Sequence, residues 1–310
     1  MRKYIVKRIL LLIPIALCSS LLIFSLMSLT GDPAWTIVGE NGTQEEYLAV
    51  REALGLDDPL LVRYTNYMKG VIFERDLGQD IYGRSVWDEY MQRLPSSLIL
   101  ALVSVLLTVV LAVPLGILAA IKQNSPADFG LSAVAIVGMS VPNFWLGLML
   151  IILFSLNLGW LPTSGAEDGI RSIILPAIAS SVSNIAVVSR MTRSSMLDCL
   201  RADYLRTARA KGVREKAVVV KHALGNALIP ILTSLSNQFA ILIGGSVIVE
   251  TVFAWPGVGN MIITAVKNKD ATTVTGGVMM TTVIVAVILL LVDILYAYVD
   301  PRIKAKYQGK

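Results

Sequence analysis

The sequence predicts an all-α membrane protein with about six transmembrane helices, and three observations support this fold class. Hydrophobic residues make up 55% of the 310-residue chain and charged residues only 16%, with a mean hydropathy of +0.68. A soluble domain usually carries about 25% charged residues. Long apolar stretches also recur along the chain, and the basic residues are distributed unevenly between them. We therefore expect lipid, rather than water, to contact much of the surface.

Six stretches contain the roughly 20 mostly apolar residues that a helix needs to cross the hydrocarbon core. The fourth and fifth are interrupted by Ser, Thr, Asn and Gln, which favours burial among other helices over exposure to lipid. Pro142 and Asn143 are expected to break the third helix locally. The predicted spans are 9–29, 97–121, 132–158, 172–192, 226–249 and 274–299.

The first stretch resembles a signal peptide only in its basic start. Its apolar region runs for about 20 residues, whereas a signal peptide has roughly 7–15. It ends in LTGDP (29–33) without a small-x-small cleavage pattern. We therefore expect residues 1–29 to be a retained N-terminal transmembrane helix.

Lysine and arginine set the expected orientation, because they are enriched in cytoplasmic loops. With the N-terminus inside, 18 of the 27 basic residues fall on the inner segments 1–8, 122, 190–225 and 300–310. We expect a multi-pass protein of the cell (inner) membrane with both termini cytoplasmic.

The span pattern divides the chain into three parts. Residues 30–96 carry twelve Asp and Glu residues together with turn residues, which predicts a folded extracytoplasmic insert after the first helix. That insert is a candidate docking surface, although its acidity is equally that of an ordinary solvated surface. Residues 97–310 form a predicted five-helix transmembrane core with a cytoplasmic loop at 190–225.

No motif for catalysis or for ATP binding occurs in the sequence. It lacks G-x-x-x-x-G-K-[ST], G-x-S-x-G and H-E-x-x-H. One histidine and two cysteines supply no His/Cys metal cluster. We therefore expect a non-enzymatic chain with no metal and no cofactor of its own.

The inner loop 190–225 is far longer than a reversal between two helices requires. Within it, residues 203–212 are expected to form a short helix that Gly212 ends as a C-cap, and a basic run follows from Arg214 to Lys221. Two interpretations fit this composition. The loop lies on anionic headgroups, or its helix docks in a groove of a cytoplasmic partner.

The run DYLRTARAKGV (203–213), with KHAL (221–224) and NALIP (226–230), resembles the cytoplasmic loop of ABC importer permeases, and most closely the dipeptide/oligopeptide/nickel branch. The resemblance extends over essentially the whole chain. Further matching segments are GDPA (31–34), LGLD (54–57), SVPNFW (140–145), VETVFAWPGVG (249–259), VDILYA (292–297) and DPR (300–302).

The chain departs from the family's loop motif, which has Glu-Ala-Ala and then Gly four residues later. Anchored on Gly212, these positions hold Arg206, Thr207 and Ala208. The later Ile and Pro positions fall on His222 and Gly225. The small residue and the glycine are kept, but any role of the family's carboxylate does not transfer to this chain.

The resemblance implies a type I ABC importer permease-like fold and an alternating-access mechanism. Residues 203–212 would be the coupling helix seated in a groove of a cytoplasmic ATPase, and its motion would pass through 214–225 to the fifth span. The implied partners are a second permease subunit (identical, or homologous as in a heterodimer), two ATPase subunits that bind ATP and Mg²⁺, and an extracytoplasmic substrate-binding protein. The expected ATPase-coupling residues are Asp203, Tyr204, Arg206, Thr207, Ala208, Ala210, Lys211, Gly212 and His222.

Polar groups within the predicted spans are candidates for a substrate pathway. Such groups need hydrogen-bond partners in a low-dielectric setting, so they either bond between helices or line a wet path. They are Asn143, Ser183, Asn184, Asn237 and Gln238. On the outer side, Trp255, Pro256 and Gly257 force a turn that we interpret as an outer gate or a docking edge for the binding protein.

The substrate class follows only from the branch, which carries dipeptides, oligopeptides, glutathione, nickel chelates and some sugars. Peptides are the commonest, so we expect peptide transport. The alternatives are a secondary transporter or channel without an ATPase, which predicts buried ionisable residues or inverted repeats near the midplane, and a membrane-embedded scaffold.

Overall fold

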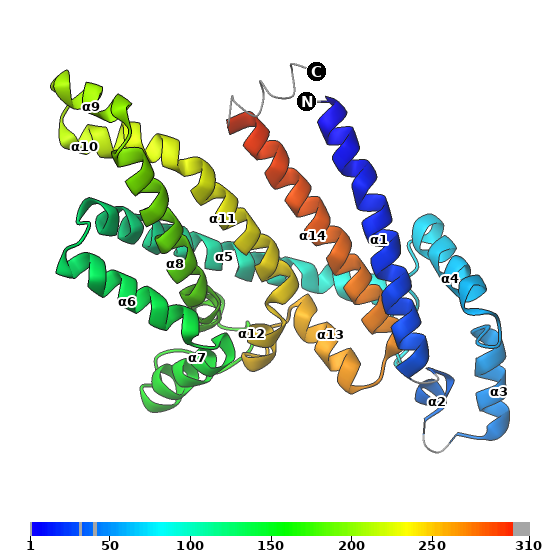
Figure 1. The fold of residues 1–310 in the computed structure, drawn as a ribbon. Helices are drawn as coiled ribbons and strands as arrows, with labels where there is room; N and C mark the ends of the chain where they lie inside the picture. The colour runs from blue at the N-terminus through cyan, green and yellow to red at the C-terminus, as the bar shows by residue number, and fades with distance from the viewer. Residues whose placement is uncertain (1, 31–32, 40–41, 300–310) are drawn as a thin grey trace. The chain divides into compact units, whose positions relative to one another are not determined.

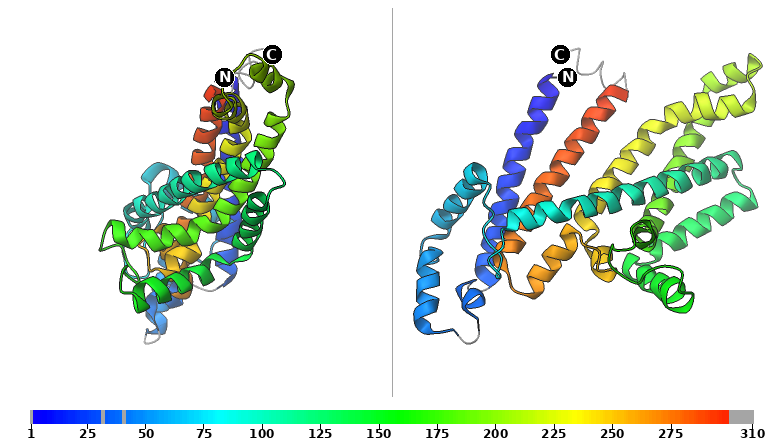
Figure 2. Two further views of the ribbon diagram at one scale, coloured as in Figure 1. Left: turned by 90° about the vertical axis from the view of Figure 1, so that its left-hand side faces the viewer. Right: turned by 180° about the vertical axis from the view of Figure 1, so that it is seen from behind.

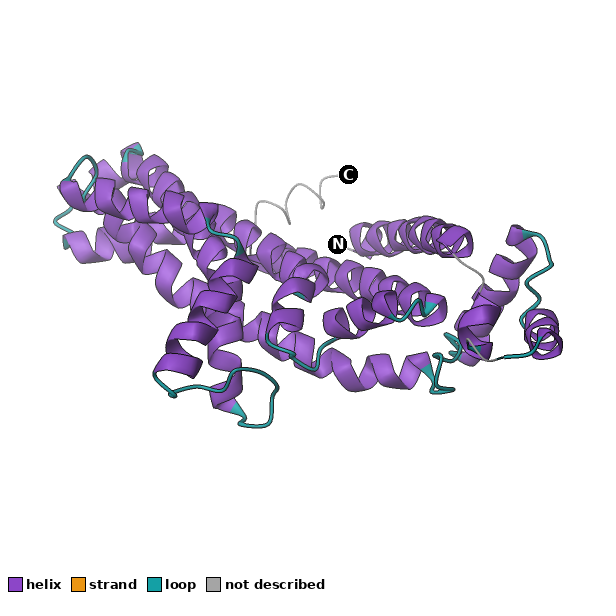
Figure 3. Ribbon diagram, turned by 90° about the horizontal axis from the view of Figure 1, so that it is seen from below, coloured by secondary structure: helices purple, strands orange, loops and turns teal. Residues whose placement is uncertain are grey.

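The computed structural model describes residues 2–30, 33–39 and 42–299, and the regular elements in this part of the chain are all helical (Figures 1 and 3). Five of its helices are long and apolar enough to cross a membrane, and a bent pair makes a sixth span if counted as one. The predicted all-α membrane fold is therefore confirmed. Gly31, Asp32 and the DPR segment (300–302) lie outside the described residues.

The chain divides into two compact units, each of which is described by itself. The first comprises Met1–Ser97 and Pro256–Leu291, and the second comprises Leu98–Trp255 and Val292–Lys310. Helix α5 (Val86–Ile121) contributes residues to both units.

The first unit contains the predicted insert in folded form. Its α3 begins at a capping box in which the Thr43 side chain accepts from the Glu46 N–H and the Glu46 side chain accepts from the Thr43 N–H. The hydroxyl of Tyr64 on α4 lies 2.8 Å from the Ser20 hydroxyl on α1, so the insert is tied to the first span. The helices of this unit are α1 (Arg2–Thr30), α2 (Pro33–Val38), α3 (Gln44–Ala53), α4 (Leu60–Lys69), η1 (Gly70–Glu74), α13 (Val258–Lys267) and α14 (Ala271–Val299), the last of which extends beyond Leu291.

The second helical span begins earlier than its apolar stretch predicts. Helix α5 starts at Val86 rather than at residue 97. The Ser85 hydroxyl accepts a hydrogen bond from the Asp88 N–H at 3.2 Å, and the Glu89–Arg93 pair supports the first turns at 2.8 Å. Polar capping therefore starts the helix about eleven residues upstream of the apolar stretch.

In the second unit, α8 packs against α6, α7 and α11 (Figure 1). Gly116 on α5 sits directly against α8, because a Cβ added there would lie 2.5 Å from the Thr192 Cβ and 2.6 Å from the Ser189 carbonyl oxygen. Small residues allow this close approach of membrane helices. The helices of this unit besides α5 are α6 (Pro126–Ser140), α7 (Asn143–Leu150), η2 (Ile151–Asn157), α8 (Ile170–Leu200), α9 (Asp203–Ala210), α10 (Glu215–Ala217), η3 (Val218–Ala223), α11 (Leu224–Gly245) and α12 (Val247–Val252).

The third predicted span is not a single helix over 132–158. It consists of α6 and of α7 with η2, bent by 97° at the break. Val141 is extended, with φ −81° and ψ 121°, because the ring of the following proline disfavours helical backbone before it. The expected break at Pro142–Asn143 is thus confirmed.

Helical structure extends into the predicted loop 190–225 from both sides. Helix α8 continues to Leu200 and α10 begins at Glu215, so residues 201–214, which include α9 (Asp203–Ala210), connect the two. Both helices therefore extend beyond the apolar stretches from which the boundaries 190 and 225 were inferred.

An ion pair that the sequence analysis missed ties α6 to α8. The Arg193 guanidinium donates from Nε and Nη2 to the two carboxylate oxygens of Asp128, both at 2.6 Å. Asp128 is 2% exposed, and it also accepts from the Asn124 backbone N–H at 3.0 Å. The two residues are 65 positions apart, so no local pattern predicts the pair.

Replacing Asp128 with alanine should destabilise the protein by about 3 kcal/mol, because Arg193 would keep its charge in a partly buried setting without a partner. This value is at the lower end for a broken buried pair, since the Arg193 side chain is 30% exposed. Thermal unfolding of the detergent-solubilised chain measures the loss. The double variant Asp128→Leu/Arg193→Met should recover most of it, and a single variant as stable as wild type would contradict the assignment.

Candidate functional site

Helix α9 lies at the end of the hairpin formed by α8 and α11 (Figures 1 and 2). Its C-terminus is a Schellman motif: the Val213 N–H donates to the Ala208 carbonyl at 3.2 Å, and the Gly212 N–H donates to the Arg209 carbonyl at 2.9 Å. Gly212 adopts φ +77°, a left-handed conformation that side-chain-bearing residues rarely adopt. The predicted helix and its glycine cap are therefore confirmed.

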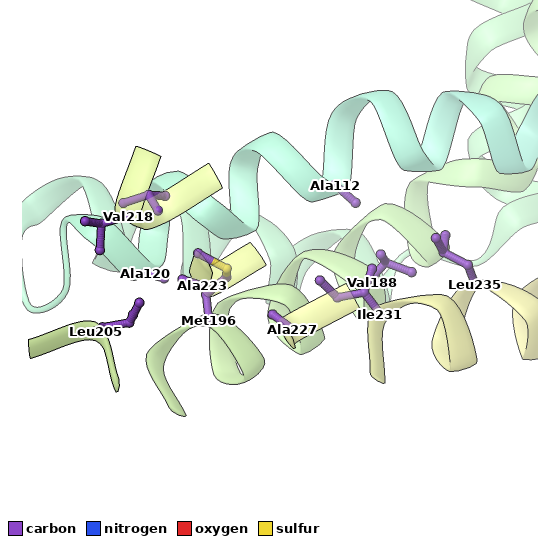
Figure 4. Packing of buried hydrophobic residues seen from close by; sticks show 11 residues of the cluster. Ala112, Ala120, Val188, Met196, Leu205, Val218, Ala223, Ala227, Ile231 and Leu235 are labelled. Atoms are coloured by element: carbon purple, nitrogen blue, oxygen red, sulfur yellow. The ribbon is translucent and has the colours of Figure 1, made fainter. Parts of the chain in front are cut away.

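Leu205 anchors this helix to the core of the second unit. It is 0% exposed and belongs to a buried cluster with Met196 of α8, Val218 of η3, Ile231 of α11 and Ala120 of α5. Figure 4 shows these side chains along the α5, α8 and α11 ribbons. A displacement of α9 must therefore move or repack a core that several spans share.

Two polar contacts add to this anchor. The Asn226 amide of α11 donates to the Tyr204 hydroxyl at 3.1 Å and to the His222 carbonyl at 3.0 Å. The Arg209 guanidinium pairs with both carboxylate oxygens of Glu215, at 2.8 and 3.1 Å. The bidentate pair fixes the geometry of the chain that leads from α9 into α10 and η3.

The predicted coupling residues divide into an outward face and an anchoring face. Arg206 and Asp203 expose 80% and 96% of their side chains and are 3.8 Å apart. Ala208 and His222 are half-buried. The exposed residues are Asp203, Tyr204, Arg206, Thr207, Ala210, Lys211 and Gly212, and of these Tyr204 also contacts Asn226 of the anchor. Sequence reasoning omitted Leu205 and Arg209; Leu205 could have been recognised as the one aliphatic residue larger than alanine between 203 and 212.

The predicted pathway residues come together only in part. The Ser183 hydroxyl of α8 donates to the Asn143 side-chain oxygen at 3.2 Å, at the start of α7. Asn184 is 8% exposed and donates to the Ser180 carbonyl within α8 at 3.0 Å. On α11, Asn237 is exposed and Gln238 is half-buried.

The predicted outer-gate residues lie where α12 turns toward α13. Trp255 is 5% exposed and packs with Leu100, Ile173 and Ala177 in the second unit. Its backbone N–H donates to the Glu250 carbonyl at 2.8 Å. Pro256 is exposed and Gly257 is buried, and Gly257 precedes the first residue of α13.

Two family profiles together match almost the whole chain. The N-terminal profile of binding-protein-dependent transport system membrane components matches residues 1–101. The profile of binding-protein-dependent transport system inner membrane components matches residues 112–305, which include the α9 hairpin and all of the predicted site residues. The chain belongs to this family. It is therefore a membrane-embedded transport component, in agreement with the apolar spans of the structure.

Curated relatives of this transport component span its whole length. It is 40% identical to the oligopeptide transport system permease protein AppB of Bacillus subtilis, over 98% of this chain and 100% of the relative. It is 37% identical to the dipeptide transport system permease protein DppB of Alkalihalophilus pseudofirmus, over 98% and 100%. It is 40% identical to the glutathione transport system permease protein GsiC of Escherichia coli K12, over 99% and 100%.

A solved structure shares the fold. A chain of the MetNI methionine ABC transporter, in an inward-facing conformation, superposes with a TM-score of 0.59 at 19% identity. The match covers 68% of this transport component and 96% of that chain. The type I importer permease fold that the sequence predicts is therefore confirmed.

Proposed function

We propose that this chain is the translocation subunit of an ATP-driven importer of short peptides that works by alternating access. The observation that carries the proposal is α9, which presents an outward polar face while Leu205 fixes it to a core shared by α5, α8, η3 and α11. Packed cores switch between discrete arrangements rather than deforming continuously. A force that displaces α9 would therefore reorient the spans.

The force on α9 comes, in this proposal, from two cytoplasmic ATPase subunits that bind ATP and Mg²⁺. This chain carries no P-loop sequence, so nucleotide binding is assigned to those partners. The outward face of α9, with Arg206 and Lys211, sits in a groove of one ATPase. The basic residues near α9 favour a cytoplasmic location for this end and for both termini.

The translocation path is assigned to the interface with a second permease subunit, identical or homologous. Asn237 is exposed on α11, and an amide at membrane depth needs a polar partner that lipid cannot supply. Asn143 and Ser183 form a second polar point at the α6–α7 bend. The Asn184 amide is already satisfied within α8, which favours a structural role for that residue.

Peptide is the proposed substrate because the relatives are named for oligopeptides, dipeptides and glutathione. An extracytoplasmic binding protein delivers it to the outer side, where Trp255, Pro256 and Gly257 are proposed to form part of the gate.

Uptake of radiolabelled dialanine into proteoliposomes tests this function. The vesicles contain this chain, its partner permease, both ATPases and the binding protein. We expect accumulation that requires ATP, and that stops when the P-loop lysine of the ATPase is replaced. Accumulation driven by an ion gradient without the ATPase would instead identify a secondary transporter.

A further inference from the structure

The first unit contains a cavity of about 560 Å³ that none of the predicted sites uses. Its wall is formed by the C-terminal part of α1, the segment 54–58, α4, the segment 76–83 and the first turns of α14. All of these residues belong to the same compact unit. The volume falls within the roughly 300–1,000 Å³ of small-molecule sites.

One cation in this wall has no acidic partner among the described residues. The Arg63 guanidinium of α4 lies over the Phe24 ring of α1, with Cζ 5.7 Å from the ring centroid. Elsewhere in the same wall, the Asp80 carboxylate is already occupied by Arg84 at 2.6 Å. Arg63 therefore retains donors that can bind an incoming carboxylate in the bidentate manner typical of arginine.

Two acids in the wall retain acceptor capacity. Asp76 is exposed and accepts the Gly78 backbone N–H at 2.7 Å, which uses one of its lone pairs. Asp58 is exposed as well and lines the same cavity. A carboxylate accepts several hydrogen bonds, so either side chain can bind an ammonium group.

A buried hydroxyl adjoins these charges. The Tyr67 ring packs 5.5 Å from Phe24, measured between ring centroids, and its hydroxyl has no hydrogen-bond partner within the described residues. Burial and, next, the charge of Asp76 raise the pKa of Tyr67, so the phenol keeps its proton. Buried donors without an acceptor are rare in folded proteins, and a small movement of the ring toward a ligand oxygen would satisfy this one.

We propose that this cavity binds a short zwitterionic peptide, with the peptide carboxylate at Arg63 and its ammonium group at Asp76 or Asp58. This arrangement of one unpaired cation and two acids matches a ligand that carries both charges. The inference rests on the proposed peptide import, because it places a peptide site in the permease on the extracytoplasmic side, separate from the binding protein.

Equilibrium binding of radiolabelled dialanine tests the site. The permease complex is held in phosphatidylcholine nanodiscs without ATP and without the binding protein. Wild type should bind dialanine saturably, and N-acetyl-dialanine amide, which lacks both charges, should not compete. Arg63→Gln should weaken binding about 10-fold or more, since hydrogen bonds to charged groups are the strong ones. Tyr67→Phe should weaken it about 5-fold.

Control variants distinguish the loss of the Arg63 charge from a disturbance of the fold. Lys69→Gln removes a cation from an exposed position of the same helix, outside the cavity wall, and should leave binding within about twofold of wild type. Arg63→Lys keeps the charge and should bind better than Arg63→Gln. Equal binding by Arg63→Gln and wild type, or competition by the blocked peptide, would overturn the proposal.

Three further outcomes are informative. Phosphatidylethanolamine retained by wild type but lost from Arg63→Gln, with no dialanine binding, would assign the cavity to a lipid headgroup and overturn the peptide site. ATP-dependent uptake by a complex that binds no dialanine without the binding protein would overturn only the cavity inference. Saturable binding by a complex that shows no ATP-dependent uptake would keep the site and overturn the importer.

Discussion

Replacing Gly212 with tryptophan is expected to reduce ATP-linked uptake to less than about a tenth of wild type. Gly212 has φ +77°, and a residue with a side chain pays about 1–2 kcal/mol in this conformation. A Cβ added there meets no atom within 4 Å, so the first side-chain atom has open space around it. The indole projects from the end of α9, where the proposed ATPase groove must receive the helix.

Two smaller substitutions separate backbone strain from bulk. Gly212→Ala pays the same backbone cost with little added volume, and Gly212→Asn carries the side chain that best tolerates left-handed backbone. We expect the asparagine variant to transport within about twofold of wild type. The uptake rate of the alanine variant should lie between those of the asparagine and tryptophan variants. Measurements are the initial rate of dialanine uptake and the stimulated ATPase activity. A tryptophan variant that inserts and transports normally would remove α9 as the docking element.

Replacing Leu205 with alanine is expected to uncouple ATP hydrolysis from transport. Leu205 is 0% exposed in the cluster that joins α9 to α8, η3 and α11, and truncating a buried leucine to alanine costs about 2–5 kcal/mol. Leu205 is the buried residue of this short helix, so the loss of its packing weakens the attachment of α9 to the cluster. We therefore expect at least a tenfold loss of uptake, with faster backbone hydrogen exchange in residues 201–214.

Tyr204 supplies the matched control for Leu205. Tyr204→Phe removes the hydroxyl that accepts from Asn226 at 3.1 Å but keeps the ring, and such a bond contributes about 1 kcal/mol. Uptake should fall no more than about threefold, and Leu205→Met should resemble wild type, because the side-chain volume is kept. Unchanged exchange across α9 in Leu205→Ala would show that the leucine is not its anchor.

The sequence by itself determined the spans and the location of the loop helix. The length of each apolar stretch and the distribution of charges along the chain are read directly from the sequence, without knowledge of the fold. The cap at Gly212 was equally predictable, because the left-handed conformation that ends a helix favours glycine locally. The break at Pro142 followed from the missing N–H and from the restriction on the preceding residue.

Element boundaries were less predictable, because hydrophobicity indicates which residues lie within the membrane and not where a helix begins or ends. Helix α5 begins at Val86 through capping by Ser85, and α8 continues to Leu200 beyond its apolar stretch. The bend of 97° between α6 and α7 has a local cause, but its size depends on what the two helices pack against.

Only the tertiary structure decided which residues act together. Asp128 and Arg193 pair across 65 positions, and Leu205 packs in a cluster with residues of α5, α8, η3 and α11. The cavity around Arg63 is built from segments as far apart as α1 and α14. A sequence pattern records the polarity of each residue and its local backbone preference, whereas these contacts depend on how distant helices pack, which no short pattern encodes.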